Sequence, residues 1–263
     1  MELSDEQFVR YARHLILEEV GDEGQERLLQ SRVLCVGAGG LGSPILMYLA
    51  AAGIGTLGII DHDEVDLSNL QRQIVHATAS VGKPKVVSAK ETLERVNPTI
   101  EIRTYPDRLA PNNVESIFAD YNLIVDGTDN FDTRYLINDA AYLGAKTVVS
   151  GALLRFEGQI TTFRGGVEGH RGEPCYRCLF REPPPPDTIP RCEEAGILGA
   201  VAGVIGTLQA TEVLKELMGI GDSMSGQLLV FDAIGMAFRK IRYKRNPTCP
   251  LCGDIPVITS IVD

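Results

Sequence analysis

The stretch Val33–Arg72 decides the fold of this chain, and it reads VLCVGAGGLGSPILMYLAAAGIGTLGIIDHDEVDLSNLQR. An apolar strand, Val33–Val36, runs into a glycine-rich turn, and a helix then leads to a second strand that ends at Asp61. The turn has the pattern G-x-G-x-x-G with an acidic residue about 20 positions on, which is typical of a nucleotide held in a strand–helix–strand unit. Its glycines let backbone amides and the helix N-terminus approach a phosphate.

Further polar residues follow this turn. A dinucleotide enzyme would need only the turn and Asp61, yet Asp63, Asp66, Asn69 and Arg72 come next. This addition favours a nucleotide that takes part in a reaction over one that only docks.

Composition narrows the class of protein. The chain has 263 residues, 44% of them hydrophobic, and a net charge of −10. A core of normal size is expected, and general nucleic-acid binding is disfavoured because polyanion binders usually carry a basic surface. The N-terminus lacks an apolar signal core, and the most apolar window, Ala195–Leu208, is too short to span a bilayer. We expect a cytoplasmic protein without a membrane contact, and a buried helix in that window.

The rest of the chain alternates strands with helices, which predicts an α/β fold with a doubly wound parallel sheet. A helical segment, Asp5–Leu29, broken near Gly21–Gly24, precedes this alternation. After Gly151 strands no longer alternate regularly with helices, which predicts antiparallel strands added to the parallel core. One domain over 1–263 is expected, with N-terminal helices at 1–30, a nucleotide-binding core at 31–165, and an irregular loop with the C-terminal part at 166–263. Predicted strands are Val33–Val36, Leu57–Asp61, Ile100–Tyr105, Leu123–Gly127, Thr147–Ser150, Gln159–Phe163, Gln227–Phe231 and Phe238–Tyr243, and predicted helices are Ser43–Ala52, Lys85–Asn97, Asn112–Ala119 and Thr133–Leu143.

Two C-x-x-C pairs form the second strong signal. Cys175 and Cys178 in one pair, with Cys249 and Cys252 in the other, supply four thiolates, which suits tetrahedral zinc. A closed shell of four sulfurs leaves no position for water, so we predict a structural four-cysteine zinc site that ties the irregular segment Gly169–Ala195 to the C-terminus. Unrelated reduced cysteines, or a redox pair, are the alternatives.

Charged residues near the predicted strand ends point to a Mg–nucleotide enzyme. Arg72 and Lys85 follow the second strand, and a reaction that builds negative charge on phosphates needs such cations. Asp129 and Asn130 follow the strand Leu123–Gly127, where ligands of open α/β sheets bind. The Asp129 carboxylate can hold Mg²⁺ there. Each charge alone could equally be a solvated surface residue or a helix cap.

The chain resembles the ubiquitin-activating-enzyme superfamily in its bacterial form, the adenylyltransferases of sulfur-carrier proteins in the molybdopterin-synthase and thiazole pathways. The resemblance covers Tyr11 to Gly253 and rests on GAGGLGSP (37–44), DHDEVDLSNLQRQ (61–73), VGKPK (81–85), DGTDN (126–130), SGA (150–152), GEPCYRC (172–178) and NPTCPLCG (246–253).

This resemblance implies a Rossmann-like fold and a reaction. The C-terminal Gly-Gly carboxylate of a small ubiquitin-like sulfur carrier attacks the α-phosphorus of ATP and gives an acyl-adenylate and pyrophosphate, for later thiocarboxylate formation in molybdenum cofactor or thiamine biosynthesis. Asp61 would hold the ribose, Asn69, Arg72 and Lys85 the ribose or phosphates, and Asp129 Mg²⁺. The implied nucleotide site comprises Gly37, Gly39, Gly40, Gly42, Asp61, Asp63, Asn69, Arg72, Lys85, Asp129 and Asn130.

The resemblance also implies a homodimer and leaves one cysteine ambiguous. Arg13 matches a family arginine that reaches the partner's active site. Cys192 matches the position of a reactive cysteine, which is covalently used in some branches and not in the molybdopterin branch. No rhodanese-like extension follows Asp263, so we expect a separate sulfur donor, either a cysteine desulfurase or a sulfurtransferase.

Three other functions stay open. An NAD-dependent oxidoreductase would share the glycine turn, but it has no need of the polar set around it. A tRNA-modifying dehydratase of the same superfamily is disfavoured by the net charge of −10. A non-catalytic module that binds the nucleotide or the carrier would retain the same residues.

Overall fold

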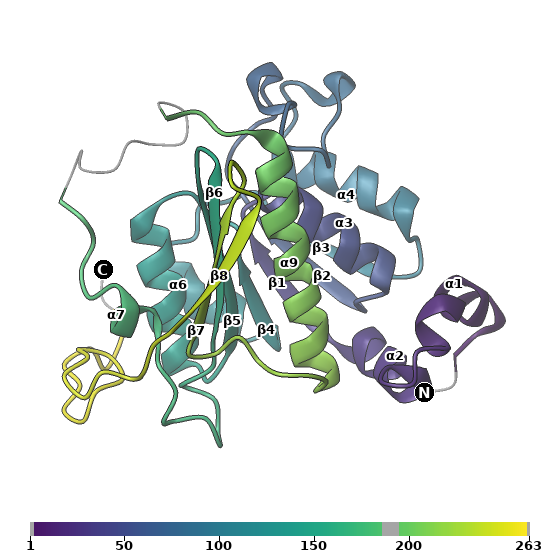
Figure 1. The fold of residues 1–263 in the computed structure, drawn as a ribbon. Coiled ribbons are helices and arrows are strands. Elements are labelled where there is room, and N and C mark those ends of the chain that lie inside the picture. Colours follow the sequence, from purple (N-terminus) through teal and green to yellow (C-terminus); the bar gives the residue numbers. More distant parts are fainter. Residues whose placement is uncertain (1–2, 186–194, 262–263) are drawn as a thin grey trace.

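One eight-stranded sheet runs through the computed structural model, which describes residues 3–185 and 195–261 (Figure 1). Its strand order is β3-β2-β1-β4-β5-β6-β7-β8. The strands β1 to β5 are parallel to one another, and β6 to β8 extend the sheet through antiparallel pairs that start with β5 and β6. The predicted α/β fold with a parallel core and antiparallel additions is therefore confirmed. The strands are β1 Arg32–Val36, β2 Thr56–Ile60, β3 Glu101–Tyr105, β4 Leu123–Asp126, β5 Thr147–Leu154, β6 Glu157–Phe163, β7 Gln227–Asp232 and β8 Ala237–Arg242.

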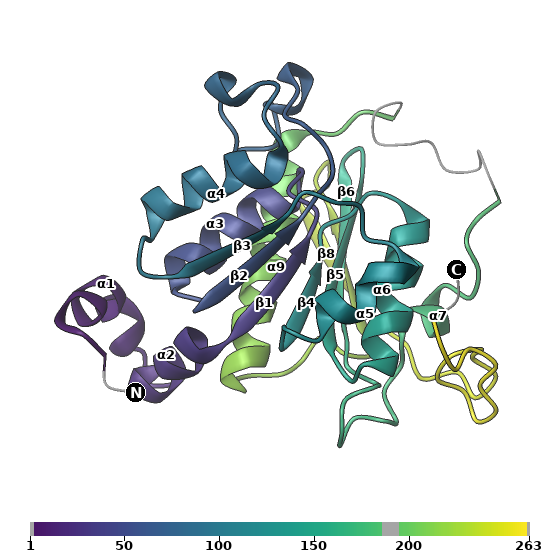
Figure 2. The same ribbon diagram turned by 180° about the vertical axis from the view of Figure 1, so that it is seen from behind.

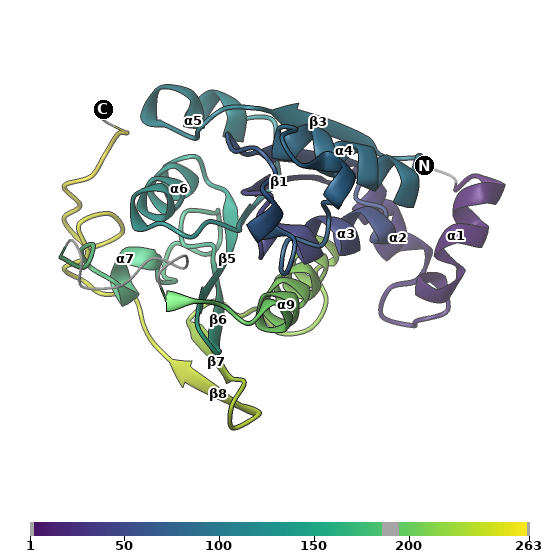
Figure 3. The same cartoon turned by 90° about the horizontal axis from the view of Figure 1, so that it is seen from above.

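Helices cover both faces of the sheet (Figures 2 and 3). On one face α3, α4 and α9 pack together, while α5 and α6 cover the other face. For α3 to α6 this division follows from right-handed crossovers between parallel strands, whereas α9 connects the antiparallel strands β6 and β7. The helices are α1 Asp5–Leu15, α2 Gly21–Gln30, α3 Gly42–Ala52, α4 Lys85–Val96, α5 Pro111–Phe118, α6 Phe131–Leu143, α7 Tyr176–Leu179 and α9 Gly199–Met218, with short 3-10 turns η1 Leu67–Asn69 and η2 Thr78–Ser80.

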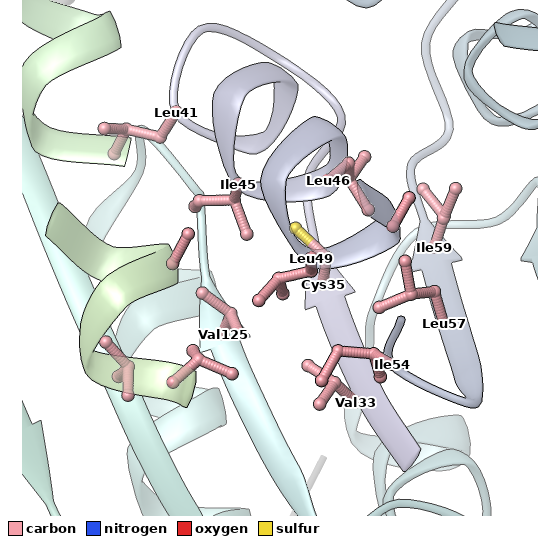
Figure 4. Packing of buried hydrophobic residues seen from close by; sticks show 14 of the residues in the cluster. Val33, Cys35, Leu41, Ile45, Leu46, Leu49, Ile54, Leu57, Ile59 and Val125 are labelled. Atoms are coloured by element: carbon pink, nitrogen blue, oxygen red, sulfur yellow. The ribbon is translucent and has the colours of Figure 1, made fainter. Parts of the chain in front are cut away.

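The central strand β1 is buried on both faces, as its continuous apolar sequence predicts. Because side chains alternate along a strand, Val33 and Cys35 pack toward α3, and Leu34 and Val36 toward the opposite helix layer. Figure 4 shows Val33 and Cys35 among the apolar side chains of α3 and the neighbouring strands. This packing fixes the end of β1, from which the glycine turn starts.

The N-terminal helical segment is interrupted earlier than predicted. Helix α1 ends at Leu15, and Gly21, with a φ of 53°, begins α2 instead of lying within a break. Tyr11 anchors α1 to the rest of the chain, since its ring is buried and its hydroxyl accepts a 2.9 Å hydrogen bond from Asn97 Nδ2.

Most of the apolar window at Ala195–Leu208 lies in the first half of a longer helix, and its first four residues precede that helix. Helix α9 begins at Gly199 and continues to Met218, where Gly219 in the left-handed conformation ends it. Its second half alternates buried residues such as Val213 with charged ones such as Lys215, so apolar content alone did not reveal it. Within residues 3–185 and 195–261, no helix is both long enough and apolar enough to cross a membrane.

Helices α3 and α9 approach each other closely at Gly206. A Cβ on this residue would lie 2.7 Å from the carbonyl oxygen of Leu41 and would collide with the ring of Pro44. One turn earlier on the same helix, a Cβ on Gly203 would meet no atom within 4 Å. The two glycines therefore differ in whether tertiary packing requires them.

We predict that Gly206→Ala lowers the free energy of unfolding by about 1–3 kcal/mol, because α9 must move away from α3. Gly203→Ala is the matched control and should be neutral or stabilising by up to about 1 kcal/mol, since alanine favours a helix. Urea unfolding of both variants measures the difference. Equal midpoints for the two would contradict the close packing.

Candidate active site

The strand order reverses between β1 and β4, and we use the word crevice for the region outside the carboxyl ends of these two strands. Ligands of open α/β sheets bind at this position, outside the carboxyl ends of the strands. Gly37 follows β1 with a φ of 96°, and a Cβ there would lie 2.9 Å from the carbonyl oxygen of Gly127 after β4. A Cβ on Gly42 would collide with the Gly37 carbonyl group. These two glycines are required by the turn itself.

Gly39 and Gly40 are not required by the surrounding protein. Neither has a positive φ, and a Cβ would find its nearest neighbour at 3.7 Å for Gly39 and 3.5 Å for Gly40. Their backbone N–H groups donate to no acceptor among residues 3–185 and 195–261. Glycines with free amides at the start of α3 suit the approach of an anion.

Asp61 supports the turn from the end of β2. Its Oδ2 accepts a 2.8 Å hydrogen bond from the Ala38 N–H, and its Oδ1 accepts one of 2.9 Å from the Asp63 N–H. Each carboxylate oxygen has a further lone pair. Asp61 is partly exposed and could therefore accept from a ribose hydroxyl while it still holds the turn.

Lys85 lies at the first position of α4 and is only 6% exposed. Its Nζ donates a 2.8 Å hydrogen bond to Asp63 Oδ2. Burial alone would raise the pKa of Asp63, but the hydrogen bond and charge of Lys85 outweigh it and hold that pKa below its ordinary value. The buried cation is therefore balanced by a carboxylate that faces solvent.

Arg72 and Asn69 belong to the segment after β2, which extends beyond the carboxyl ends of the strands (Figures 1 and 2). Arg72 packs its stem beside Gly40, and its Nη1 lies 3.3 Å from the Ser68 carbonyl oxygen. Asn69 closes η1, where its side chain lies 3.4 Å from the Asp66 N–H. Both are partly exposed at the crevice.

Asp129 and Asn130 follow β4, as predicted. The Asp129 side chain is exposed and makes no hydrogen bond or ion pair with any described residue. Asn130 caps α6, because its Oδ1 accepts a 2.9 Å hydrogen bond from the Thr133 N–H. A second group, Asp61, His62 and Asp63, brings its ligand atoms within 4.8 Å of one another, but Lys85 already engages one of these carboxylates.

Arg13 and Cys192 are the remaining residues predicted for the active site. Arg13 is exposed on α1, which lies beside α2 at the periphery of the fold (Figure 1). Cys192 falls outside the described residues.

The sequence did not identify the buried network behind the crevice. Asp126 ends β4 and is fully buried, and its Oδ2 accepts from Arg134 Nε at 3.1 Å and from Ser150 Oγ at 2.7 Å. Its Oδ1 accepts from the Thr128 N–H at 3.0 Å. Arg134 also donates to the carbonyl oxygens of Thr128 and Gly151. A carboxylate at the end of a buried strand needs a compensating partner. The aspartate directly after the apolar run Leu123–Val125 was therefore the sequence feature that could have predicted this network.

The four cysteines of the two C-x-x-C pairs come together beside α7. Sγ–Sγ distances are 4.0 Å for Cys175–Cys178, 3.6 Å for Cys175–Cys249 and 3.2 Å for Cys178–Cys252, and all four sulfurs lie within 4.8 Å of one another. Hydrogen bonds from Cys175 and Cys252, and one from the Asn246 N–H, hold the pKa of Cys178 well below its ordinary value. The cluster could hold a metal ion.

The whole chain is similar to proteins that bear adenylyltransferase names. It is 48% identical over 264 residues to the sulfur carrier protein adenylyltransferase of Thermus thermophilus, covering 100% of this chain and 97% of that protein. It is 48% identical over 261 residues to the probable adenylyltransferase/sulfurtransferase MoeZ of Mycobacterium tuberculosis, covering 99% of this chain and 65% of MoeZ. The mouse adenylyltransferase and sulfurtransferase MOCS3 is 47% identical, and the match covers 99% of this chain and 56% of MOCS3. The chain thus spans nearly all of the first relative and about two thirds or less of the other two.

Solved structures of more distant proteins share the fold. Escherichia coli MccB in complex with MccA-N7isoASN superposes with a TM-score of 0.81 at 19% identity, over 93% of this chain and 75% of MccB. PaaA superposes with a TM-score of 0.78 at 24% identity, over 93% of this chain and 76% of PaaA. The model of the ThiF family matches residues 11–251, most of the chain. This match and the full-length relatives show that the chain belongs to the ThiF family.

Proposed function

We propose that this chain is an ATP-dependent adenylyltransferase that activates the C-terminal Gly-Gly carboxylate of a small ubiquitin-like sulfur carrier. The observation that carries the proposal is the full-length similarity to a sulfur carrier protein adenylyltransferase. The crevice supports it, because the free amides of Gly39 and Gly40 follow β1, while Asp61, Arg72 and Asp129 follow its two neighbouring strands. These are the residue types that a nucleoside triphosphate needs.

In this reaction a carboxylate oxygen of the carrier attacks the α-phosphorus, and the bond to the bridging oxygen of pyrophosphate breaks. The products are the acyl-adenylate and pyrophosphate. Such a displacement depends mainly on positioning and charge neutralisation and needs no nucleophile from the protein. The glycine amides would orient the phosphates, Asp61 the ribose, and Arg72 and Lys85 would balance the charge on the leaving group.

Mg²⁺ would complete this charge balance. Asp129 fits it as a ligand, because its carboxylate is exposed next to the crevice and engages no described residue. Bound Mg²⁺ would neutralise phosphate oxygens while pyrophosphate leaves.

Zinc fits the four-cysteine cluster. Tetrahedral coordination at about 2.3 Å per Zn–S bond requires sulfurs about 3.8 Å apart. Three of the six Sγ–Sγ separations are 3.2 to 4.0 Å, and all six are within 4.8 Å, which is close to this value. A zinc ion here would be structural and would tie the α7 segment to the C-terminal turns, which lie side by side (Figures 1 and 3).

A homodimer would explain why large apolar side chains are exposed and why Arg13 lies on a peripheral helix. Large apolar side chains are exposed on α1, α3, α4 and the segment between β2 and α4; they are Phe8, Val9, Tyr48, Leu67, Ile74 and Val87. A partner chain that covers such side chains removes their apolar area from water. A second copy would cover it and would bring the partner copy's α1, with its arginine, to the crevice.

The other candidate functions gain no specific support from the crevice. A nicotinamide-dependent oxidoreductase leaves Arg72, Lys85 and Asp129 without a purpose, and the net charge of −10 opposes tRNA binding. The choice between the molybdenum cofactor and thiamine pathways, the separate sulfur donor and the use of Cys192 are parts of the proposal that carrier-specific assays must decide.

We predict that Asp129→Ala lowers carrier-dependent ATP–pyrophosphate exchange by about 100-fold or more, because phosphate charge is no longer neutralised. Asp222→Ala, an exposed aspartate in the turn between α9 and β7, is the control and should keep the wild-type rate. Exchange is measured with purified carriers that have an intact Gly-Gly end. A near-normal rate in Asp129→Ala would contradict the assigned role.

We predict about one zinc per chain in the purified protein and its loss in Cys249→Ala, since one sulfur ligand is removed. Cys35→Ala removes a thiol that is buried within β1 and should retain the metal. Atomic absorption measures the metal content. Zinc that persists in Cys249→Ala would contradict the four-sulfur site.

We predict that Arg13→Ala and Asp129→Ala are each inactive, whereas refolded mixtures of the two recover about a quarter of wild-type exchange. Half of the dimers would then be mixed, and each mixed dimer would contain one complete site out of two. No recovery in a mixture that demonstrably forms mixed dimers would contradict a site shared between subunits.

A further inference from the structure

His76 lies directly behind the glycine turn and is not among the residues assigned to the nucleotide. Its side chain is buried, with the residue 8% exposed, in the segment between η1 and η2. Both ring nitrogens are engaged: Nε2 lies 2.9 Å from the Ala38 carbonyl oxygen, and Nδ1 lies 2.9 Å from Ser88 Oγ.

These two partners determine where the ring carries its proton. A carbonyl oxygen can only accept a hydrogen bond, so the proton must be on Nε2. In the neutral ring, Nδ1 then accepts from the Ser88 hydroxyl group. Burial is the largest influence and lowers the pKa of His76; the hydrogen bond to Ala38 opposes it, the charge of Lys85 lowers the pKa further, and Asp61 has the smallest, raising effect. The neutral form with the proton on Nε2 is therefore the state that the surroundings favour.

The Ala38 carbonyl group belongs to the same peptide unit as the Gly39 N–H. In a planar trans peptide, the C=O and N–H bonds point in opposite directions. A hydrogen bond that pulls the carbonyl oxygen toward His76 therefore turns the Gly39 N–H away from His76. This amide donates to no described residue.

The preceding peptide unit is held as well. The Ala38 N–H donates to Asp61 Oδ2 at 2.8 Å, so Ala38 is fixed on both sides. Ser88 and Lys85 lie three positions apart on α4, and both face this region. Helix α4 thus supplies both the Lys85 cation and the hydroxyl that orients the His76 ring.

We infer that His76 is a positioning residue for nucleotide binding, which fixes the Ala38–Gly39 peptide so that the Gly39 amide is directed at a phosphate oxygen. The inference rests on the proposed function, because it assumes that the turn binds ATP. We expect His76 to affect the affinity for MgATP and not the rate of the chemical step, because the Gly39 amide would contact the phosphate equally in the bound state and in the transition state.

The test is MgATP binding to the full chain, measured by calorimetry, in His76→Phe, His76→Gln and Ser88→Ala. Phenylalanine keeps the ring volume but cannot donate to Ala38, and we expect Kd for MgATP to rise about tenfold, the effect of one typical hydrogen bond. Glutamine places an N–H near the position of Nε2 and should keep Kd within about threefold of wild type. Ser88→Ala, which removes only the orienting hydroxyl group, should fall between the two.

Each outcome decides the inference. Wild-type affinity in His76→Phe overturns it. An equal loss in the phenylalanine and glutamine variants also overturns it, because ring packing alone would then be responsible. If His76→Phe does not fold, the comparison of Ser88→Ala with His76→Gln tests the inference. A higher Kd for MgATP in His76→Gln than in Ser88→Ala overturns it. If the wild-type chain binds no MgATP, the proposed function itself fails.

Discussion

The rest of the crevice depends on the enclosed carboxylate of Asp126. A buried charge of this kind is tolerated only when partners compensate for lost water, and removal of one partner from such a pair costs about 3–5 kcal/mol. Arg134 from α6, Ser150 from β5 and the Thr128 N–H supply the compensation. The Asp126 carbonyl group in turn accepts from Gln209 of α9, so four elements are fixed at one point. The loop that carries Asp129 starts from this point.

A second carboxylate has a matching position on the other side of β1. Asp61 follows β2 and fixes the glycine turn through Ala38, as Asp126 fixes the loop after β4. The two differ in exposure, since Asp126 is fully buried while Asp61 reaches the surface. This difference separates their tasks: Asp126 has its hydrogen-bonding capacity used internally, whereas Asp61 keeps lone pairs for a ligand.

The sequence predicted those features that depend on local pattern. Glycine spacing at Gly37–Gly42 predicted the turn, and the alternation of strands with helices predicted the parallel core. The change of this pattern after Gly151 predicted the antiparallel additions, and the C-x-x-C pairs predicted the sulfur cluster. It did not predict the Asp126–Arg134 pair or the contact between His76 and Ala38. Such contacts depend on side-chain directions and on distances between segments that are brought together only by the folded sheet. His76 in particular lies 38 positions from its partner, and no spacing rule connects them.

The crevice combines groups that hydrogen bonds hold in place with charged groups that have few partners, and this combination suits a reaction that depends on positioning. The groups proposed to determine geometry, the Asp61 carboxylate and the Ala38 backbone, make two hydrogen bonds each. The groups proposed to neutralise charge, Arg72 and Asp129, have few internal partners and can adjust to the phosphates. A rigid backbone cradle costs little entropy when the nucleotide binds, because its conformation is already fixed. Flexible charges at the margin can then follow the change from bound triphosphate to departing pyrophosphate.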